Sequence, residues 1–144
     1  MTVATVMTTA PACCTPNTPL VDVARLMVEN DCGEIPVVED LGSRKLAGVI
    51  TDRDIATRVV AAGRNSAEAR AMDAMTSPAL SVHSDTSLQE CCELMETHQI
   101  RRVPVVDESG GVVGIVSLAD VVRSANSATT VAVVKEVSSG LERG

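Results

Sequence analysis

The chain has 144 residues, a formal net charge of −7 and no Phe, Tyr or Trp. Proteins that bind nucleic-acid backbones concentrate Lys and Arg, so 12 basic against 19 acidic residues argue against a nucleic-acid partner. The apolar runs are far shorter than the roughly 20 residues of a membrane span, and no signal peptide is recognisable. We therefore expect a soluble, cytoplasmic protein without a membrane partner, whose core consists of aliphatic, Met and Cys side chains.

The sequence contains an internal repeat. Two kinds of segment recur after 68 positions: Met7-Thr8 as Met75-Thr76, and Ile35-Pro36-Val37-Val38 as Val103-Pro104-Val105-Val106. A third motif recurs after 66 positions: Gly48, Thr51 and Asp54 as Gly114, Ser117 and Asp120. The second copy is therefore two residues shorter. The difference falls at the polar stretch Glu39–Lys45 of the first copy, which contains a Gly and predicts a turn.

Each copy predicts the element order β-α-β-β-α, after a short helical piece at residues 4–7 or 71–75. The expected elements of the first copy are an extended segment 12–15, a helix 19–30, strands 34–38 and 46–51, and a helix from 52 to about 62. Those of the second copy are an extended segment 79–82, a helix 87–98, strands 102–106 and 112–117, and a helix from 118 to about 125. Thr18 before Pro19, and Thr86 three residues before Gln89, are the expected start signals of the first helix in each copy.

This pattern divides the chain into a first repeat (1–62), a linker (63–70), a second repeat (71–125) and a C-terminal extension (126–144). A unit of roughly 60 residues builds only a marginal core by itself, so we expect the two copies to share one core. Packed face to face about a pseudo-twofold axis, they would form two similar clefts. Within the extension, the apolar segment Val131–Val137 is interpreted as cover for the edge of a dimer.

The five cysteines do not form a zinc motif, because neither doublet is a Cys-x-x-Cys and no pair of His accompanies them. Cys91 and Cys92 fall on the apolar face of the predicted helix 87–98, which indicates burial. For Cys13, Cys14 and Cys32, both burial and a redox role stay open.

The repeated motif Gly-x-x-Thr/Ser-x-x-Asp suits a ligand site. Gly48 and Gly114 would let a ligand approach the backbone closely. Thr51 and Ser117 stand where a strand passes into a helix, so that the hydroxyl and free N–H groups can hold a phosphate. The carboxylates of Asp54 and Asp120 suit the hydroxyls of a ribose. The same spacing, however, also describes a helix cap with an acidic partner and no ligand at all.

In this order and in two copies, the segments resemble the tandem cystathionine β-synthase (CBS) domain pair, or Bateman module, over about residues 1–125. The resemblance implies an α/β (α+β) fold of two repeats packed through their small sheets, and usually a homodimer. It also implies a regulatory, non-enzymatic module that binds AMP, ADP, ATP or S-adenosylmethionine between the repeats, with Asp54 or Asp120 on the ribose.

Further side chains complete the predicted site. The basic ones, which would neutralise phosphate, are Arg53, Arg101 and Arg102. The apolar ones, which would sandwich an adenine, are Ile35, Val37, Val103 and Val105. Because Gly33-Glu34 stands where the second copy has Arg101-Arg102, and Glu34 would repel a phosphate, the two clefts should differ in affinity.

Three classes of function are relevant to this sequence: an enzyme, a nucleotide sensor, and an interaction or structural protein. The sequence shows no catalytic triad, P-loop or metal cluster, which argues against an enzyme. A sensor of an adenine nucleotide would pass a conformational change to an unknown protein effector or to the dimer. The alternative is a ligand-free stress-response protein with an interaction or structural role and vestigial nucleotide sites.

Overall fold

The computed structural model describes residues 1–128, with side chains through residue 124, so the predicted segment Val131–Val137 lies outside the described residues. The elements of the first half are η1 (Val3–Thr5), β1 (Thr8–Thr9), α1 (Leu20–Glu29), β2 (Glu34–Val38), β3 (Leu46–Thr51), α2 (Asp52–Ile55) and the π-helical η2 (Ala56–Val60). Those of the second half are η3 (Ala71–Asp73), β4 (Val82–His83), α3 (Leu88–His98), β5 (Arg102–Val106), β6 (Val112–Ser117) and α4 (Leu118–Ala128). The four longer strands begin and end where the sequence predicts.

The helix starts differ from the prediction. Ser87, rather than Thr86, caps α3, because its hydroxyl accepts the backbone N–H of Glu90 at 3.1 Å. The hydroxyls of Thr86 and Thr18 instead accept backbone N–H groups three residues earlier in the chain. Both threonines therefore close the turn before the helix, and Pro19 takes the cap position of α1 without a side-chain cap bond.

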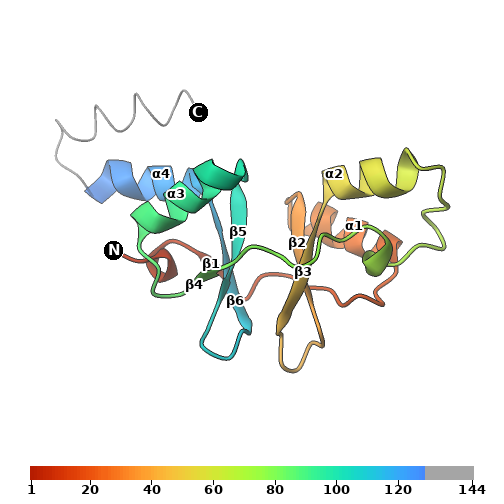
Figure 1. The fold of residues 1–144 in the computed structure, drawn as a ribbon, viewed down its shortest axis with the longest axis horizontal. Helices are drawn as coiled ribbons and strands as arrows, with labels where there is room; N and C mark the ends of the chain where they lie inside the picture. The colour runs from red at the N-terminus through yellow and green to blue at the C-terminus, as the bar shows by residue number, and fades with distance from the viewer. Residues whose placement is uncertain (129–144) are drawn as a thin grey trace.

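Two small sheets stand side by side at the centre of the molecule, with the helices on their outer sides (Figure 1). In each copy, two antiparallel strands form a hairpin, β2 with β3 and β5 with β6. The second sheet has the order β1-β6-β5-β4. Single bridges from Thr76 to Val49 and from Cys14 to Val37 give the first sheet the same arrangement. This correspondence expresses the pseudo-twofold relation between the repeats.

The expectation of one shared core was wrong, because the described residues form two separate hydrophobic clusters. Each cluster is completed by the segment that precedes the other copy in the sequence. Val3 and Met7 pack into the second cluster, and Ala71 and Ala74 pack into the first. The sequence repeats are thus exchanged at their beginnings, and this exchange, rather than a common core, joins the halves.

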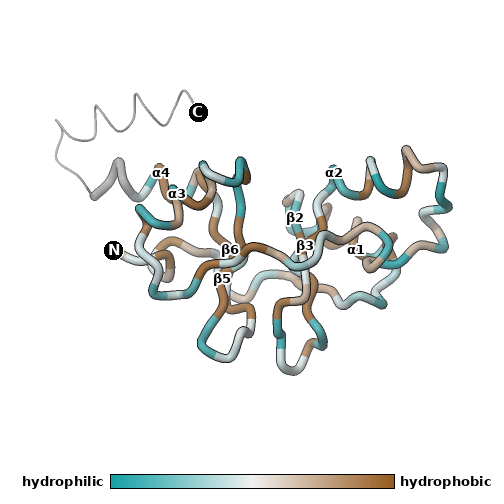
Figure 2. The backbone as a smooth tube through the Cα atoms, in the orientation of Figure 1, coloured by the Kyte–Doolittle hydropathy of each residue, from teal (hydrophilic) through white to brown (hydrophobic). Residues whose placement is uncertain are grey.

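A second junction lies at the tips of the two hairpins. The backbone N–H of Leu46 donates to Gly110 at 3.1 Å, and that of Val112 donates to Arg44 at 2.8 Å. The Arg44 guanidinium also donates to the carbonyl of Pro11 at 2.9 Å. Hydrophilic residues mark these tips, whereas hydrophobic residues follow the strands toward the centre (Figure 2). The hairpin tips therefore hold one end of the space between the sheets closed.

Gly48 and Gly114 meet the protein's own chain, and not an open space for a ligand as the sequence suggested. A Cβ at Gly48 would lie 2.5 Å from the backbone carbonyl oxygen of Thr76. A Cβ at Gly114 would lie 2.4 Å from the Met7 sulfur and 3.0 Å from the Thr8 carbonyl oxygen. The two glycines therefore make room for the crossing segments.

Because a Cβ would meet the backbone at Gly48 but first a side chain at Gly114, replacing the two glycines by alanine should destabilise the fold to different extents. Gly48→Ala should lower the free energy of unfolding by roughly 1–3 kcal/mol, because a backbone carbonyl in the sheet cannot move aside. Gly114→Ala should cost less, because its closest contact is the flexible end of Met7. Denaturant unfolding measures both variants. Gly42→Ala in an exposed turn is the control and should stay within about 0.5 kcal/mol; equal losses for Gly48→Ala and Gly42→Ala would contradict the assignment.

Candidate functional site

Both copies of the Thr/Ser-x-x-Asp motif form a reciprocal helix cap. The Thr51 hydroxyl accepts the N–H of Asp54 at 3.0 Å, and the Asp54 carboxylate accepts the N–H of Thr51 at 3.0 Å. Ser117 and Asp120 repeat the pattern at 3.1 and 3.3 Å. The capping interpretation is therefore confirmed for both motifs. One carboxylate oxygen of each Asp is committed to the backbone, and the other faces its surroundings.

In the first copy this second oxygen faces an anchored arginine. Arg58 Nε lies 4.0 Å from Oδ1 of Asp54, and the same guanidinium donates to the carbonyls of Met75 at 2.6 Å and Ala74 at 3.2 Å. The Thr76 hydroxyl reaches the capping oxygen of Asp54 at 3.5 Å. Asp54 is thus tied to the crossing segment, and only 16% of its side chain is exposed.

In the second copy the corresponding carboxylate stands at an open hollow. Asp120 pairs with Arg123, one turn further along α4, whose side chain is 74% exposed. A hollow of about 290 Å³ lies against this pair and has polar walls: Thr8, Arg102, Ser117, Asp120 and Arg123, with Ile115 and Ala119. Polar groups of both signs therefore converge at this point of the cleft.

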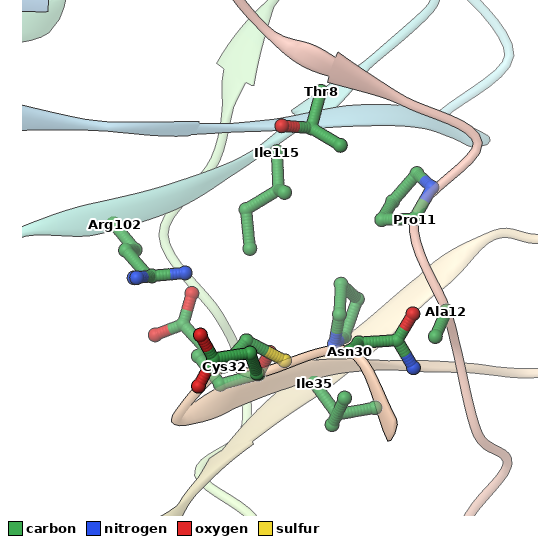
Figure 3. Close-up of a pocket in the computed structure, with 11 residues that line it drawn as sticks. Thr8, Pro11, Ala12, Asn30, Cys32, Ile35, Arg102 and Ile115 are labelled. Atoms are coloured by element: carbon green, nitrogen blue, oxygen red, sulfur yellow. The ribbon is translucent and has the colours of Figure 1, made fainter. Parts of the chain in front are cut away.

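A second hollow of about 160 Å³ adjoins the first, because Thr8, Arg102 and Ile115 line both. Its other walls come mainly from the first copy and from the crossing segment: Pro11, Ala12, Asn30, Asp31, Cys32, Glu34, Ile35 and Pro36. Ile115 points into the space between the repeats, and the Arg102 guanidinium lies at its side (Figure 3). Together the two hollows reach the size of small-molecule sites, roughly 300–1,000 Å³.

Glu34 brings a buried carboxylate to this cleft. Its Oε2 atom is shielded from solvent and has no hydrogen-bond partner among the described residues. The pKa of Glu34 is raised to about 7: burial is the main cause, the positive charge of Arg102 opposes it, and the negative charge of Asp54 adds to it. The carboxyl group is therefore about half protonated near neutral pH.

The structure brings together some predicted residues and separates others. Arg102, Ser117 and Asp120 line the joined hollows, whereas Thr51 and Asp54 lie in the other copy. Ile35 borders the smaller hollow, but its side chain is 1% exposed and belongs to the first core. Arg53 and Arg101 are exposed and line none of the hollows described above. The remaining predicted contacts are buried inside the cores: Val37, Val103 and Val105.

The alternation of side chains along a strand explains why Val37, Val103 and Val105, which were predicted to contact an adenine, lie in the cores. Neighbouring residues of a strand point to opposite faces, so Val37 and Val103 face the cores while Pro36 reaches the cleft. Sequence reasoning missed Thr8, Pro11 and Ile115, and it did not consider Arg123. The recurring Met-Thr pair was the available signal for Thr8, although its position in the opposite sheet could not be inferred from it.

Burial holds the thiols of Cys13 and Cys14 in their protonated form. Burial raises the pKa of Cys13, although Arg44 opposes the change, and burial raises that of Cys14 to about 12. These thiols therefore stay protonated near neutral pH and are poor nucleophiles. In the described part of the chain, no group of three or more His, Cys, Asp or Glu residues is placed to hold a metal ion.

No helix among the described residues is long and apolar enough to cross a membrane.

The family model of the CBS domain matches twice, at residues 3–61 and 71–127. The CBS domain-containing protein YhcV of Bacillus subtilis is 41% identical over 79% of this chain and 78% of its own length. Hypoxic response protein 1 of Mycobacterium tuberculosis is 38% identical over 83% of this chain and 82% of its own length.

Solved structures show the same fold. Hypoxic Response Protein I, solved with two coordinated zinc ions, has a TM-score of 0.77 at 36% identity and covers 85% of this chain and 98% of its own. CBSX2 in complex with AMP has a TM-score of 0.72 at 29% identity, covering 86% and 95%. The CBS pair of MJ0100, in complex with 5′-methylthioadenosine and S-adenosyl-L-methionine, has a TM-score of 0.74 at 28% identity, covering 86% and 94%.

The raised pKa of Glu34 predicts a specific dependence of stability on pH. Between about pH 5 and 7 the folded chain holds a proton that the unfolded chain has lost, so stability falls as pH rises through this window. Glu34→Gln has no such proton and should gain roughly 1–3 kcal/mol over the wild type above pH 7, but little at pH 4.

Denaturant unfolding at a series of pH values measures this difference. The exposed Glu39→Gln removes the same charge one strand length away and should follow the wild-type curve. If Glu34→Gln also runs parallel to the wild type from pH 4 to 8, then Glu34 has an ordinary pKa and the burial argument is wrong.

Proposed function

Since the chain belongs to the CBS-domain family as a tandem pair, we propose that it is a cytoplasmic, non-enzymatic regulatory module that binds an adenosine-containing ligand between its repeats. AMP, ADP, ATP and S-adenosylmethionine are the candidate ligands. The observation that carries the proposal is the cleft made by the two joined hollows, which has an apolar part and a polar part. The AMP complex of CBSX2 and the methylthioadenosine and S-adenosylmethionine complex of MJ0100 support this class of ligand.

The chemistry of the cleft matches the three parts of such a ligand. Pro11, Pro36 and Ile115 offer an aliphatic slot for an adenine ring. Asp120 offers a carboxylate to the two ribose hydroxyls, which are hydrogen-bond donors. Arg102 lies between these two regions and offers a guanidinium to a 5′-phosphate or carboxylate.

We assign the ligand to the cleft of Asp120 rather than to that of Asp54. The guanidinium beside Asp54 is fixed by two backbone carbonyls, so a ligand would have to break these bonds to reach the carboxylate. The Asp120 carboxylate instead borders a hollow of about 290 Å³. A single strong site is therefore expected per chain.

A ligand in this cleft would touch both repeats and so change their relative orientation. The hairpin tips around Arg44 hold one end of the cleft, so that the opposite end is the part free to open or close. A homodimer partner or a separate protein effector would then read this change, since coupling requires that the ligand bind the two arrangements unequally.

One observation favours the ligand-free alternative. Both aspartates are already satisfied within the protein, by a helix cap on one oxygen and by an arginine at the other. A protein whose sites had lost their ligand would retain this arrangement, because it stabilises the helix starts by itself. In that case the module would serve as an interaction or structural protein.

A thermal-shift series with the four ligands separates these functions. At 100 times its dissociation constant a ligand should add about 2.7 kcal/mol to the free energy of unfolding and raise the midpoint by a few degrees. Asp120→Ala should lose this shift, and Asp54→Ala should keep it. The two variants are matched, because each removes one helix cap at a cost of about 1 kcal/mol.

Each variant is compared with its own ligand-free midpoint, so that the lost cap does not enter the result. A shift that survives in Asp120→Ala but disappears in Asp54→Ala would move the site to the first copy. The absence of any shift in the wild type, with all four ligands, would favour the ligand-free alternative.

A further inference from the structure

Glu34 and Arg102 occupy equivalent positions of the two repeats and carry opposite charges. They are 68 positions apart, at the first residue of β2 and of β5. In the two hairpins Glu34 lies opposite Thr51, and Arg102 lies opposite Ser117. The pseudo-twofold relation therefore places one acid and one base at corresponding points of the same cleft.

The two side chains differ in their surroundings. Arg102 is exposed and lines the two joined hollows as well as a wider opening of about 540 Å³. Glu34 lines only the smaller of the joined hollows, and its Oε2 atom is buried without a hydrogen-bond partner among the described residues. A buried acceptor without a partner is costly, and it is relieved when the group takes up a proton or meets a donor.

We propose that this cleft binds an anionic group at Arg102 together with one proton, which Glu34 takes up. This inference rests on the proposed function, and it specifies the chemistry of the ligand's 5′ group. An anion at Arg102 neutralises the positive charge that favours ionised Glu34 and brings a negative charge close to it. Both effects increase the affinity of Glu34 for a proton, and protonation in turn removes the repulsion between Glu34 and the anion.

The other charged groups around Glu34 reinforce this coupling. Asp54 of α2 acts on Glu34 with a like charge. Asp31, before β2, lines the same hollow, and Asp52, at the start of α2, lines the wider opening beside Arg102. On the side of α4, Asp120 and Arg123 form an ion pair at the edge of the adjoining hollow. Around Glu34 the balance is acidic, and Arg102 is the cation that acts on it.

The coupling falls in the neutral range. Because the pKa of Glu34 is about 7 before any ligand is bound, a further rise on binding an anion makes proton uptake substantial from pH 7 to 8.5. The affinity for AMP should therefore fall about threefold per pH unit near pH 7, where Glu34 is already half protonated, and up to about tenfold per unit above pH 8. Adenosine, which lacks the phosphate, should bind with little dependence on pH.

Isothermal titration calorimetry of the whole chain with AMP and with adenosine tests this proposal. Titrations at pH 8 in two buffers of different ionisation enthalpy give the number of protons taken up. The wild type should take up about one proton per AMP and close to none per adenosine. Because this measurement uses the wild type, it does not depend on the folding of a variant.

Two variants identify the groups. Glu34→Gln should bind AMP without proton uptake, more tightly than the wild type at pH 8, and with a much smaller pH dependence. Glu108→Gln removes an exposed carboxylate outside the cleft and should behave as the wild type. Arg102→Gln should weaken AMP at least tenfold while changing adenosine little.

The outcomes separate the two proposals. If AMP binds without proton uptake, or if Glu34→Gln keeps the wild-type pH dependence, the coupling is overturned while the nucleotide site stands. If Arg102→Gln binds AMP as the wild type does, the anion position is wrong. If neither AMP nor adenosine binds at any pH, the coupling and the adenosine site both fall.

Discussion

The way in which the two repeats are joined depends on two short segments that cross from one repeat to the other. Each core lacks part of its apolar filling until the segment before the opposite copy completes it, through Val3 in one case and Ala71 in the other. Gly48 and Gly114 are where these segments press against the strands: a Cβ at Gly48 would meet the backbone of Thr76, and one at Gly114 would displace the Met7 side chain. The same crossing carries Thr8 and its following residues into the space between the sheets, and the cleft therefore exists because the repeats are exchanged.

How far the sequence predicts this structure depends on the kind of information each residue carries. The four long strands follow from dense Val and Ile in a duplicated pattern, and each copy supports the interpretation of the other. The crossing strand β1 has two residues, Thr8–Thr9, which is too short for any periodic signal. For the same reason the sequence predicts Ser117 and Asp120 as a motif but cannot place Thr8 beside them, since Thr8 reaches β6 across the exchange.

The two copies also show how little change makes equivalent sites unequal. The motif aspartates have the same cap, but an arginine follows Asp54 by four positions and Asp120 by three. Arg58 thereby reaches the carbonyls of the crossing segment and stays anchored. In the second copy, the corresponding pair of Asp120 and Arg123 borders an open hollow. With Glu34 in place of Arg102 at the other shared position, we expect one cleft suited to an anion among the described residues rather than two.

The helix cap and the ligand site are compatible, because one carboxylate has capacity for both. An ionised Asp offers about four lone pairs, and the cap of α4 uses one oxygen while Arg123 faces the other. Ribose hydroxyls that bind Asp120 would therefore compete with Arg123 and leave the cap intact. In the proposed site, ligand binding would change an ion pair on α4 without unfolding the helix start. On the proposed function, an event inside the cleft would in this way reach the exposed side chain of Arg123, where a partner would respond to it.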